Sequence, residues 1–364
     1  MLKFFCLGIK SAKYERRSLE NKCASESDGE KTSGSGLNSD LFLPNEIIIE
    51  ILSWLPVDTL LRVKCVCKSW RATIQDRNFI EKHMSRARIV VECAAKMSDN
   101  NGNEKPYEWQ CVRDGLVLER RNVFPKYRIR NPATKQKLDL PNPHGPLLFI
   151  SMFFLSTSND YKAVYIHHKE GTTSCAADVA VLTIGTDSSW RSLDIPSLHN
   201  MKSQRGQILR KSIAEVYYII VLRDYEIVCL EMETENFTSV QIPERLFPDW
   251  NNIHPLNWRG KLALASVVGE KINIWVLESY KKQKWENVKV VFPLPLDSIT
   301  NDNLIPFETK GDWLRISVNY EHRVAYNMRT NRVSTLISAP PGQKIAFVYK
   351  PSLVHFKGMT PVQN

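Results

Sequence analysis

The sequence predicts a two-part protein, with a small all-α module of about three to four short helices followed by a larger all-β, propeller-like domain. Two patterns carry this prediction. Between residues 40 and 86, apolar residues recur at helical spacing and prolines interrupt them. From about residue 110 onward the spacing changes to period two, with Gly, Pro, Asn and Asp between the runs, which is typical of short strands.

The helical segment begins at Leu43-Pro44, where Pro suits the first turn of a helix because its missing N–H costs nothing there. A broad apolar stripe follows at helical spacing and ends at Pro56: Ile47, Ile48, Ile51, Leu52 and Leu55. A stripe of this width exceeds what three short helices need among themselves. We therefore expect part of it to remain available to the helices of a partner protein.

A repeat runs through the β region. A polar turn leads into an apolar or aromatic position, with an aliphatic residue three positions later, and the first copy at Lys137 is degenerate. The anchors at 137, 190, 237, 285 and 333 are separated by 53, 47, 48 and 48 residues. A period near 50 with several strands per repeat is typical of kelch-like blades, so we expect about five to six antiparallel blades. An irregular pair of β-sandwiches is the alternative.

Composition narrows the functional classes. The formal net charge of +10 favours acidic partners, although no run of five basic residues exists and dispersed surface charge explains the balance as well. The eight cysteines form no CxxC pair and no zinc spacing, which fits free thiols in a reducing compartment. No apolar run reaches 18 residues, so we expect no membrane span.

The domain boundaries follow from these patterns. We expect a flexible tail over residues 1–39, the helical module over 40–86 and a linker or the start of the repeat domain over 87–109. The repeat domain then covers 110–357, and residues 358–364 form a second tail.

The helical module resembles an F-box of the plant type. The resemblance depends on the Leu43-Pro44 start, the Leu55-Pro56 corner and the block Cys67-Lys-Ser-Trp-Arg71, with Asn78-Phe-Ile-Glu-Lys-His83 as the usual ending. The remainder resembles the F-box-associated domain of the plant families that include S-locus F-box proteins. The pieces that match are Cys111-Val-Arg-Asp-Gly-Leu-Val117, Asn131-Pro-Ala-Thr134, Asp160-Tyr-Lys162, Ser189-Trp-Arg-Ser192, Ile274-Trp-Val276 and Tyr349-Lys-Pro-Ser-Leu-Val354.

The resemblance implies a function. An F-box contacts a Skp-type adaptor, which in turn binds a cullin, so the chain is expected to be the substrate-recognition subunit of an SCF-type ubiquitin ligase. The side chains expected to contact the adaptor are Leu43, Pro44, Ile47, Ile51, Leu52, Leu55, Pro56, Leu60 and Leu61. The module's own core is expected to contain Ile48, Val63, Val66 and Trp70.

The target is expected to bind the repeat domain, where loops at one end of the blades are the default site. Trp250 and Trp258 are candidate anchors because they are large aromatic residues in segments that look like loops, although either can instead pack between blades. No catalytic motif, cofactor fingerprint or metal spacing was found, so we expect a non-catalytic receptor without cofactor or metal.

Other functional classes remain open from the sequence. The chain departs from the usual F-box pattern at Asp58, Thr59 and Val63, and lacks a usual glycine before Asp160. A non-catalytic scaffold with a drifted F-box, outside any ligase, is therefore the main alternative. Nucleic-acid binding is disfavoured, because basic and aromatic residues do not alternate along a strand face. The expected location is the cytoplasm and/or nucleus.

Overall fold

Four short helices open the described part of the chain. In the computed structural model they are α2 (Asn45–Leu52), α3 (Val57–Val63), α4 (Lys68–Gln75) and α5 (Arg77–Arg86). The sequence explains two of the starts: Cys67 Sγ accepts a hydrogen bond from Trp70 N–H, and the Asp76 carboxylate accepts one from Phe79 N–H. Pro56 separates α2 from α3, as predicted.

The structure describes residues 43–94, 107–121, 126–169, 176–199, 208–243, 246–247, 252–268, 271–291, 304–340 and 344–362. The predicted tail over 1–39 and the candidate anchor Trp250 lie outside these residues.

Twenty of the described strands form five antiparallel units of four consecutive strands. They contain β2 (Tyr107–Arg113), β3 (Leu116–Arg121), β4 (Tyr127–Asn131) and β5 (Gln136–Asp139); β6 (Leu147–Leu155), β7 (Asp160–His168), β8 (Ala177–Thr183) and β9 (Arg191–Leu193); β10 (Ile208–Ile213), β11 (Val216–Val221), β12 (Glu226–Glu231) and β13 (Phe237–Gln241); β14 (Ile253–Trp258), β15 (Lys261–Val268), β16 (Lys271–Ser279) and β17 (Lys284–Val291); and β18 (Leu304–Lys310), β19 (Trp313–Val318), β20 (His322–Asn327) and β21 (Arg332–Ser338). We call these units blades 1 to 5. A short helix, α6 (Pro196–His199), follows β9, and a 3₁₀ turn, η2 (Leu222–Asp224), follows β11.

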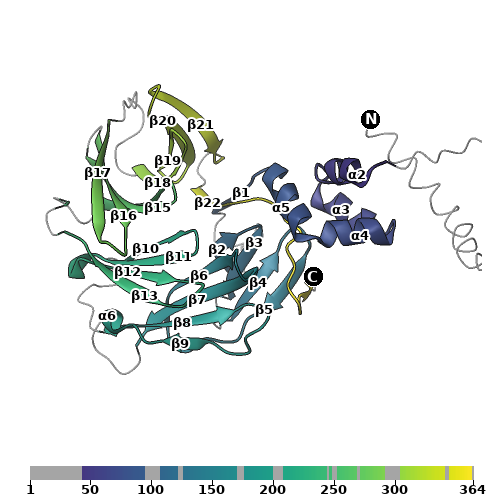
Figure 1. The fold of residues 1–364 in the computed structure, drawn as a ribbon, viewed down its shortest axis with the longest axis horizontal. Helices are drawn as coiled ribbons and strands as arrows, with labels where there is room; N and C mark the ends of the chain where they lie inside the picture. The colour runs from purple at the N-terminus through teal and green to yellow at the C-terminus, as the bar shows by residue number, and fades with distance from the viewer. Residues whose placement is uncertain are drawn as a thin grey trace, which may run out of the picture. The chain divides into compact units, whose positions relative to one another are not determined.

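The blades follow one another around a centre, which confirms the predicted propeller-like architecture (Figure 1). The first strands of neighbouring blades lie side by side, with β2 contacting β6 and β10 contacting β14. Blades 4 and 5 are joined by one parallel bridge between Asn257 and Glu308, which makes them a single eight-stranded sheet. The apolar cores lie between neighbouring blades rather than within one blade, as blade stacking requires.

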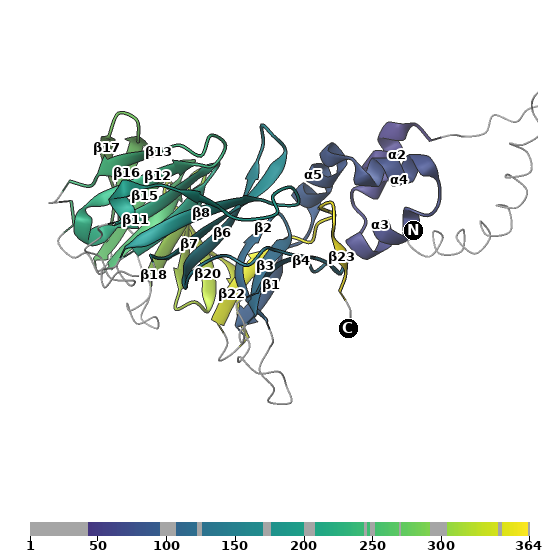
Figure 2. The ribbon, with the colours of Figure 1, turned by 90° about the horizontal axis from the view of Figure 1, so that it is seen from below.

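The two ends of the β region close the ring. Strand β1 (Val90–Ala94) pairs antiparallel with β22 (Lys344–Tyr349), and Figures 1 and 2 show this pair beside β2 and β3. Within the predicted C-terminal tail over 358–364, β23 (Thr360–Pro361) pairs with β5 through Thr360 and Lys137. The pairing extends blade 1 by one strand.

The repeat predicted from the sequence corresponds to a repeated turn before the last strand of a blade. Lys135, Glu235, Gln283 and Asn331 each have positive φ in this turn. In blades 1 and 5 an Asn side chain begins the turn. The Oδ1 atom of Asn131 accepts from the N–H groups of Ala133 and Thr134, and that of Asn327 accepts from those of Arg329 and Thr330.

Asn131 has a second role that Asn327 lacks. Its side chain is fully buried, and its amide nitrogen donates to the carbonyls of Ser352 and Val354 at 3.0 and 2.9 Å. Residues 350–356, which we call the C-terminal strap, are thereby held on blade 1. Gly115 allows the close approach, because a Cβ atom at this positive-φ position would lie 2.5 Å from the Lys350 carbonyl oxygen.

We predict that Asn131→Ala destabilises the protein much more than Asn327→Ala. The first change leaves two buried carbonyls without a donor as well as opening the turn, and should cost about 2–4 kcal/mol, whereas the second opens only an equivalent turn and should cost about 1 kcal/mol. Chemical denaturation of both variants checks this. Equal losses would mean that the bonds to the strap contribute nothing beyond the turn.

Candidate functional site

An exposed apolar strip runs along α2. Ile47 and Ile51 are 46% and 39% exposed, and their spacing of four residues places them on one side of the helix; Leu43, which precedes α2, is 58% exposed. The predicted contacts Pro44 and Pro56 are exposed as well. These five side chains are accessible to a partner in the chain by itself.

The other predicted adaptor contacts are less accessible. Leu55 and Leu61 are half-buried, while Leu52 and Leu60 are 1% and 0% exposed and belong to the core of the module. The stripe read from the sequence is wide enough to cover two faces of α2. Ile47 and Ile51 occupy the outer face, and Leu52 points inward, so a partner cannot reach Leu52 or Leu60 without opening the helices.

The predicted core also differs in part from the structure. Val63 is buried, and Ile48 and Trp70 are half-buried and pack against the core, but Val66 is exposed. Sequence reasoning missed Trp54, which is the most exposed large apolar residue among the described residues of the module. Its position three residues after Ile51 and seven after Ile47 was the available signal, because that spacing continues the same face.

Charged groups on α5 order the exposed face. The Glu50 carboxylate accepts ion pairs from Lys82 at 2.8 Å and from Arg86 at 2.6 Å, and these hydrogen bonds lower its pKa to about 2. The guanidinium of Arg86 lies 4.6 Å from the centre of the Trp54 ring, and Trp54 Nε1 donates to Glu50. The indole is therefore held in one orientation although it is exposed.

The Leu55-Pro56 corner is fixed from inside the module. His83 on α5 is buried and its Nε2 lies 2.9 Å from the Leu55 carbonyl oxygen, which can only accept, so Nε2 carries the proton. Burial lowers the pKa of His83 below its ordinary value. A neutral imidazole thus connects the end of α5 to the corner between α2 and α3, which places two separate pieces of the predicted motif in contact.

The helical module packs on the β domain through the same strap that Asn131 holds. Lys350 Nζ donates to the carbonyls of Met84 and Ser85 at the end of α5, each at 3.1 Å. At the start of α5, the guanidinium of Arg77 lies 4.0 Å from the centre of the Phe154 ring. One continuous core contains residues of the helices, blades 1 and 2 and the strap.

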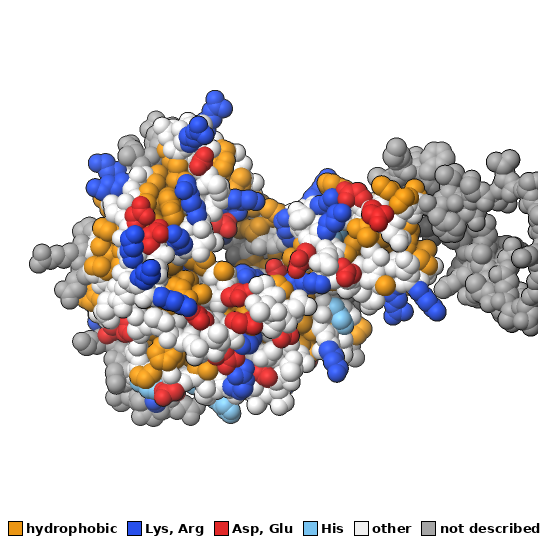
Figure 3. Space-filling model, in the orientation of Figure 1, with side chains coloured by type: hydrophobic (Ala, Val, Ile, Leu, Met, Phe, Trp, Pro, Cys, Tyr) orange, Lys and Arg blue, Asp and Glu red, His pale blue; other side chains and the backbone are white. Residues whose placement is uncertain are grey.

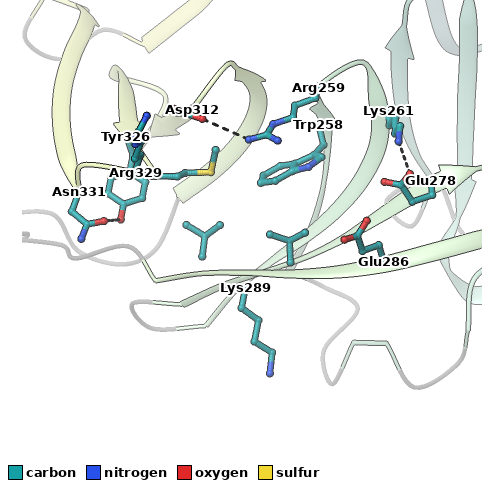
Figure 4. A pocket seen from close by; sticks show the side chains of 13 residues that line it. Trp258, Arg259, Lys261, Glu278, Glu286, Lys289, Asp312, Tyr326, Arg329 and Asn331 are labelled. Atoms are coloured by element: carbon teal, nitrogen blue, oxygen red, sulfur yellow. Dashed lines mark hydrogen bonds and ion pairs between the residues drawn. The ribbon is translucent and has the colours of Figure 1, made fainter.

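The second predicted anchor, Trp258, is 9% exposed and packs in the core between blades 4 and 5. It is therefore a packing residue rather than a protruding anchor. Its indole nevertheless lines a cleft of about 820 Å³ between these blades, together with Val288, Tyr326 and Met328. Figure 4 shows the indole at the middle of the cleft, with Arg259 and Asp312 above it and Glu278 and Glu286 on the blade 4 side.

No catalytic arrangement emerges from the described residues. They contain no group of three or more His, Cys, Asp or Glu side chains placed to hold a metal ion. Nor does any described helix combine the length and apolarity needed to cross a bilayer. His167 and His168 lie on β7, where neighbouring residues face opposite sides of the sheet.

Comparisons with known proteins agree with both parts of the fold. Residues 41–85 match the F-box-like family model, and residues 68–356 match the model of the F-box associated beta propeller domain. The chain therefore belongs to the family of proteins with an F-box associated beta propeller domain, preceded by an F-box-like module. Proteins with this pair of domains are typically adaptor-type receptors.

Similar proteins are found in Arabidopsis thaliana. F-box protein At5g65850 is 26% identical over 306 residues, which cover 72% of this chain and 74% of that protein. F-box protein At1g52495 is 25% identical, with 68% of each chain covered. F-box/kelch-repeat protein At3g04660 is 23% identical and covers 73% of this chain and 77% of its own.

We predict that the packing of α5 weakens in acid because of His83. The unfolded imidazole takes up a proton near its ordinary pKa of 6.5, whereas the buried one resists protonation, so stability is present above that pH and is lost as the pH falls below it. Hydrogen exchange of α5 at about pH 7.5 and pH 5.5 measures the effect. His83→Gln keeps a donor for the Leu55 carbonyl and should remove most of this pH dependence; an unchanged pH dependence in the variant would exclude His83 as its cause.

Proposed function

We propose that this chain is the substrate-recognition subunit of an SCF-type E3 ubiquitin ligase. Its F-box docks a Skp-type adaptor and through it a cullin, and its β domain holds a target protein for ubiquitination. The observation that supports this most strongly is the exposed strip of Ile47 and Ile51 on α2, in a module that matches the F-box-like model. Such a strip suits helix-against-helix contact with a partner.

The energies are adequate for this contact. Each aliphatic side chain that becomes fully buried contributes about 1.5–3 kcal/mol. The ordered Trp54 ring adds a large apolar surface at low entropic cost, because Arg86 and Glu50 already hold it. The departure at Val63 lies in the buried core, so it leaves this surface unchanged.

The receptor's role is positional. A target bound to the β domain is brought close to the enzyme that carries ubiquitin, which raises the effective concentration of its lysines. The bonds from Lys350 to α5 and the shared core support this role, because they join the adaptor-binding helices to the target-binding domain. We place this activity in the cytoplasm and/or nucleus.

The adaptor interaction is tested by Ile47→Asp/Ile51→Asp. Both side chains are exposed, so we expect the protein to remain folded while adaptor binding weakens by about 100-fold or more, because apolar burial worth ~3–6 kcal/mol is lost. Binding of purified full-length chain to purified adaptor by calorimetry measures the effect.

Two controls make this test specific. Ile89→Asp changes an equally exposed isoleucine outside the helical module and should bind the adaptor normally. Leu52→Asp should unfold the module, because Leu52 lies in its core. Normal adaptor binding by the Ile47/Ile51 variant would contradict the assignment of these two residues to the adaptor contact. No adaptor binding by the unaltered chain would favour the alternative of a scaffold with a drifted F-box.

A further inference from the structure

The cleft between blades 4 and 5 is open at its outer part. Near the centre of the domain the two blades are joined through β14 and β18, where Thr309 Oγ1 accepts from Arg259 N–H at 2.7 Å and donates to the Asn257 carbonyl. Farther out, the cleft of about 820 Å³ separates β17 from the turn between β20 and β21. This volume accommodates several residues of another chain.

The inner surface of this cleft is apolar. Val288 and Val290 on β17 lie opposite Ile274 and Ile272 on β16, so they share the sheet face that forms the core between blades 4 and 5. Met328 packs against the same core from the blade 5 side. Val288 and Met328 are only partly buried, so apolar surface remains uncovered inside the cleft.

The turns around the cleft are strongly basic. The four hairpin turns of blades 4 and 5 and their flanking residues, 258–261, 278–286, 309–313 and 327–332, contain eight Lys and Arg against three Asp and Glu. Their excess of five positive charges equals half of the chain's formal net charge of +10. Figure 3 shows Lys and Arg side chains gathered over the part of the surface that carries β16–β21, with apolar side chains between them.

Three of these eight cations form ion pairs with described residues. Lys261 pairs with Glu278, Arg259 with Asp312 at 3.8 Å, and Lys281 with Glu231 at 3.1 Å. Within the described ranges, the remaining five are exposed and have no ion-pair partner: Lys282, Lys284, Lys310, Arg329 and Arg332.

The basic surface is local. The equivalent turns of blade 3, residues 213–216 and 231–237, contain four Glu and no Lys or Arg. The ion pair between Lys281 and Glu231 shows that the turns of blades 3 and 4 lie at the same end of the domain. Scattered surface charge does not explain an acidic blade beside two basic ones.

We infer that this cleft binds an extended, acidic segment of the target protein. This inference depends on the proposed receptor function and specifies the class of target. A large apolar side chain of the segment enters the cleft beside Trp258, Val288 and Met328, and flanking carboxylates lie against Arg329, Arg332 and Lys284. The segment can also pair with β21, an exposed edge strand of the eight-stranded sheet.

A peptide fits this site better than a nucleic acid does. Single-stranded nucleic acids bind by stacking bases on exposed aromatic rings, but Trp258 and Tyr326 are 9% and 1% exposed and present little ring surface. Glu286 and Asp312 at the rim oppose a continuous phosphate backbone, whereas they can accept hydrogen bonds from a peptide. The apolar interior suits an aliphatic or aromatic side chain.

The test selects peptides from a random 12-residue display library with the full-length chain. We expect the selected peptides to combine Asp or Glu residues with a large apolar residue. A selected peptide, labelled with fluorescein, then gives dissociation constants by anisotropy. Selected peptides without an acidic bias would overturn the inference.

Two variants separate the apolar and the charged contributions. Val288→Glu places a charge inside the cleft. Arg329→Glu/Arg332→Glu reverses two charges in an exposed turn, so we expect this variant to fold normally. Each variant should raise the dissociation constant of the peptide by about tenfold or more. The effect of the Arg329/Arg332 variant should become smaller at high salt. Arg121→Glu/Lys357→Glu makes the same charge change at exposed positions outside these turns and should bind the peptide normally.

The remaining outcomes are also decisive. Unchanged peptide binding in Arg329→Glu/Arg332→Glu would overturn the inference, as would a single-stranded RNA 20-mer that displaces the peptide and binds more tightly. Adaptor binding is measured on the same samples. Adaptor binding by the unaltered chain, with peptide binding that the cleft variants leave unchanged, contradicts the cleft alone. Peptide binding that the cleft variants weaken, without adaptor binding by the unaltered chain, contradicts the ligase assignment alone.

Discussion

The fold depends on one buried amide. Asn131 begins a turn of blade 1 with its side-chain oxygen and holds the C-terminal strap with its side-chain nitrogen. The strap follows β22, which closes the ring by pairing with β1, and Lys350 within it binds the carbonyl end of α5. Ring closure and attachment of the helical module therefore share one set of hydrogen bonds, made in a site from which water is excluded and where a lost partner is costly.

The structure shows what residues do in several of the sequence segments that resemble the F-box-associated domain. The turn at Asp114-Gly115 lies against the strap, and Asp114 accepts a hydrogen bond from Tyr161 on blade 2. Arg191, from a fourth piece, pairs with Glu235 at 2.6 Å, and Trp190 beside it donates to the Pro141 carbonyl. These residues join one blade to the next. They are structural side chains, and none of those named here lines the cleft between blades 4 and 5.

The sequence predicted what is local and missed what depends on distant neighbours. The helical spacing predicted the helices correctly, and the period near 50 predicted the repeated turn correctly. Both features are formed by residues that are close in the chain. The spacing of apolar residues along a helix does not show which other part of the protein packs against each of its faces. Leu52 and Ile51 are adjacent and similar in chemistry, yet one is buried in the core and the other is exposed. Asn131 and Ser352 are 221 residues apart, and nothing in either sequence neighbourhood indicates their contact. Trp258 was selected for its size, but its burial was set by blade 5.

The separation between core and turns also explains how one scaffold can carry different specificities. The cores lie between blades and are made by strand residues, so they constrain the strands and leave the hairpin turns nearly unconstrained. A turn of blade 5 and the equivalent turn of blade 1 keep the same Asn-initiated backbone, while the residues between the Asn and the Thr change from Pro-Ala to Met-Arg. Met328 thereby reaches the cleft and Arg329 its rim without any change in the turn itself. The backbone of these turns does not require such side chains, and five of the cations form no ion pair with a described residue. A bound partner explains the identity of these side chains better than the fold does.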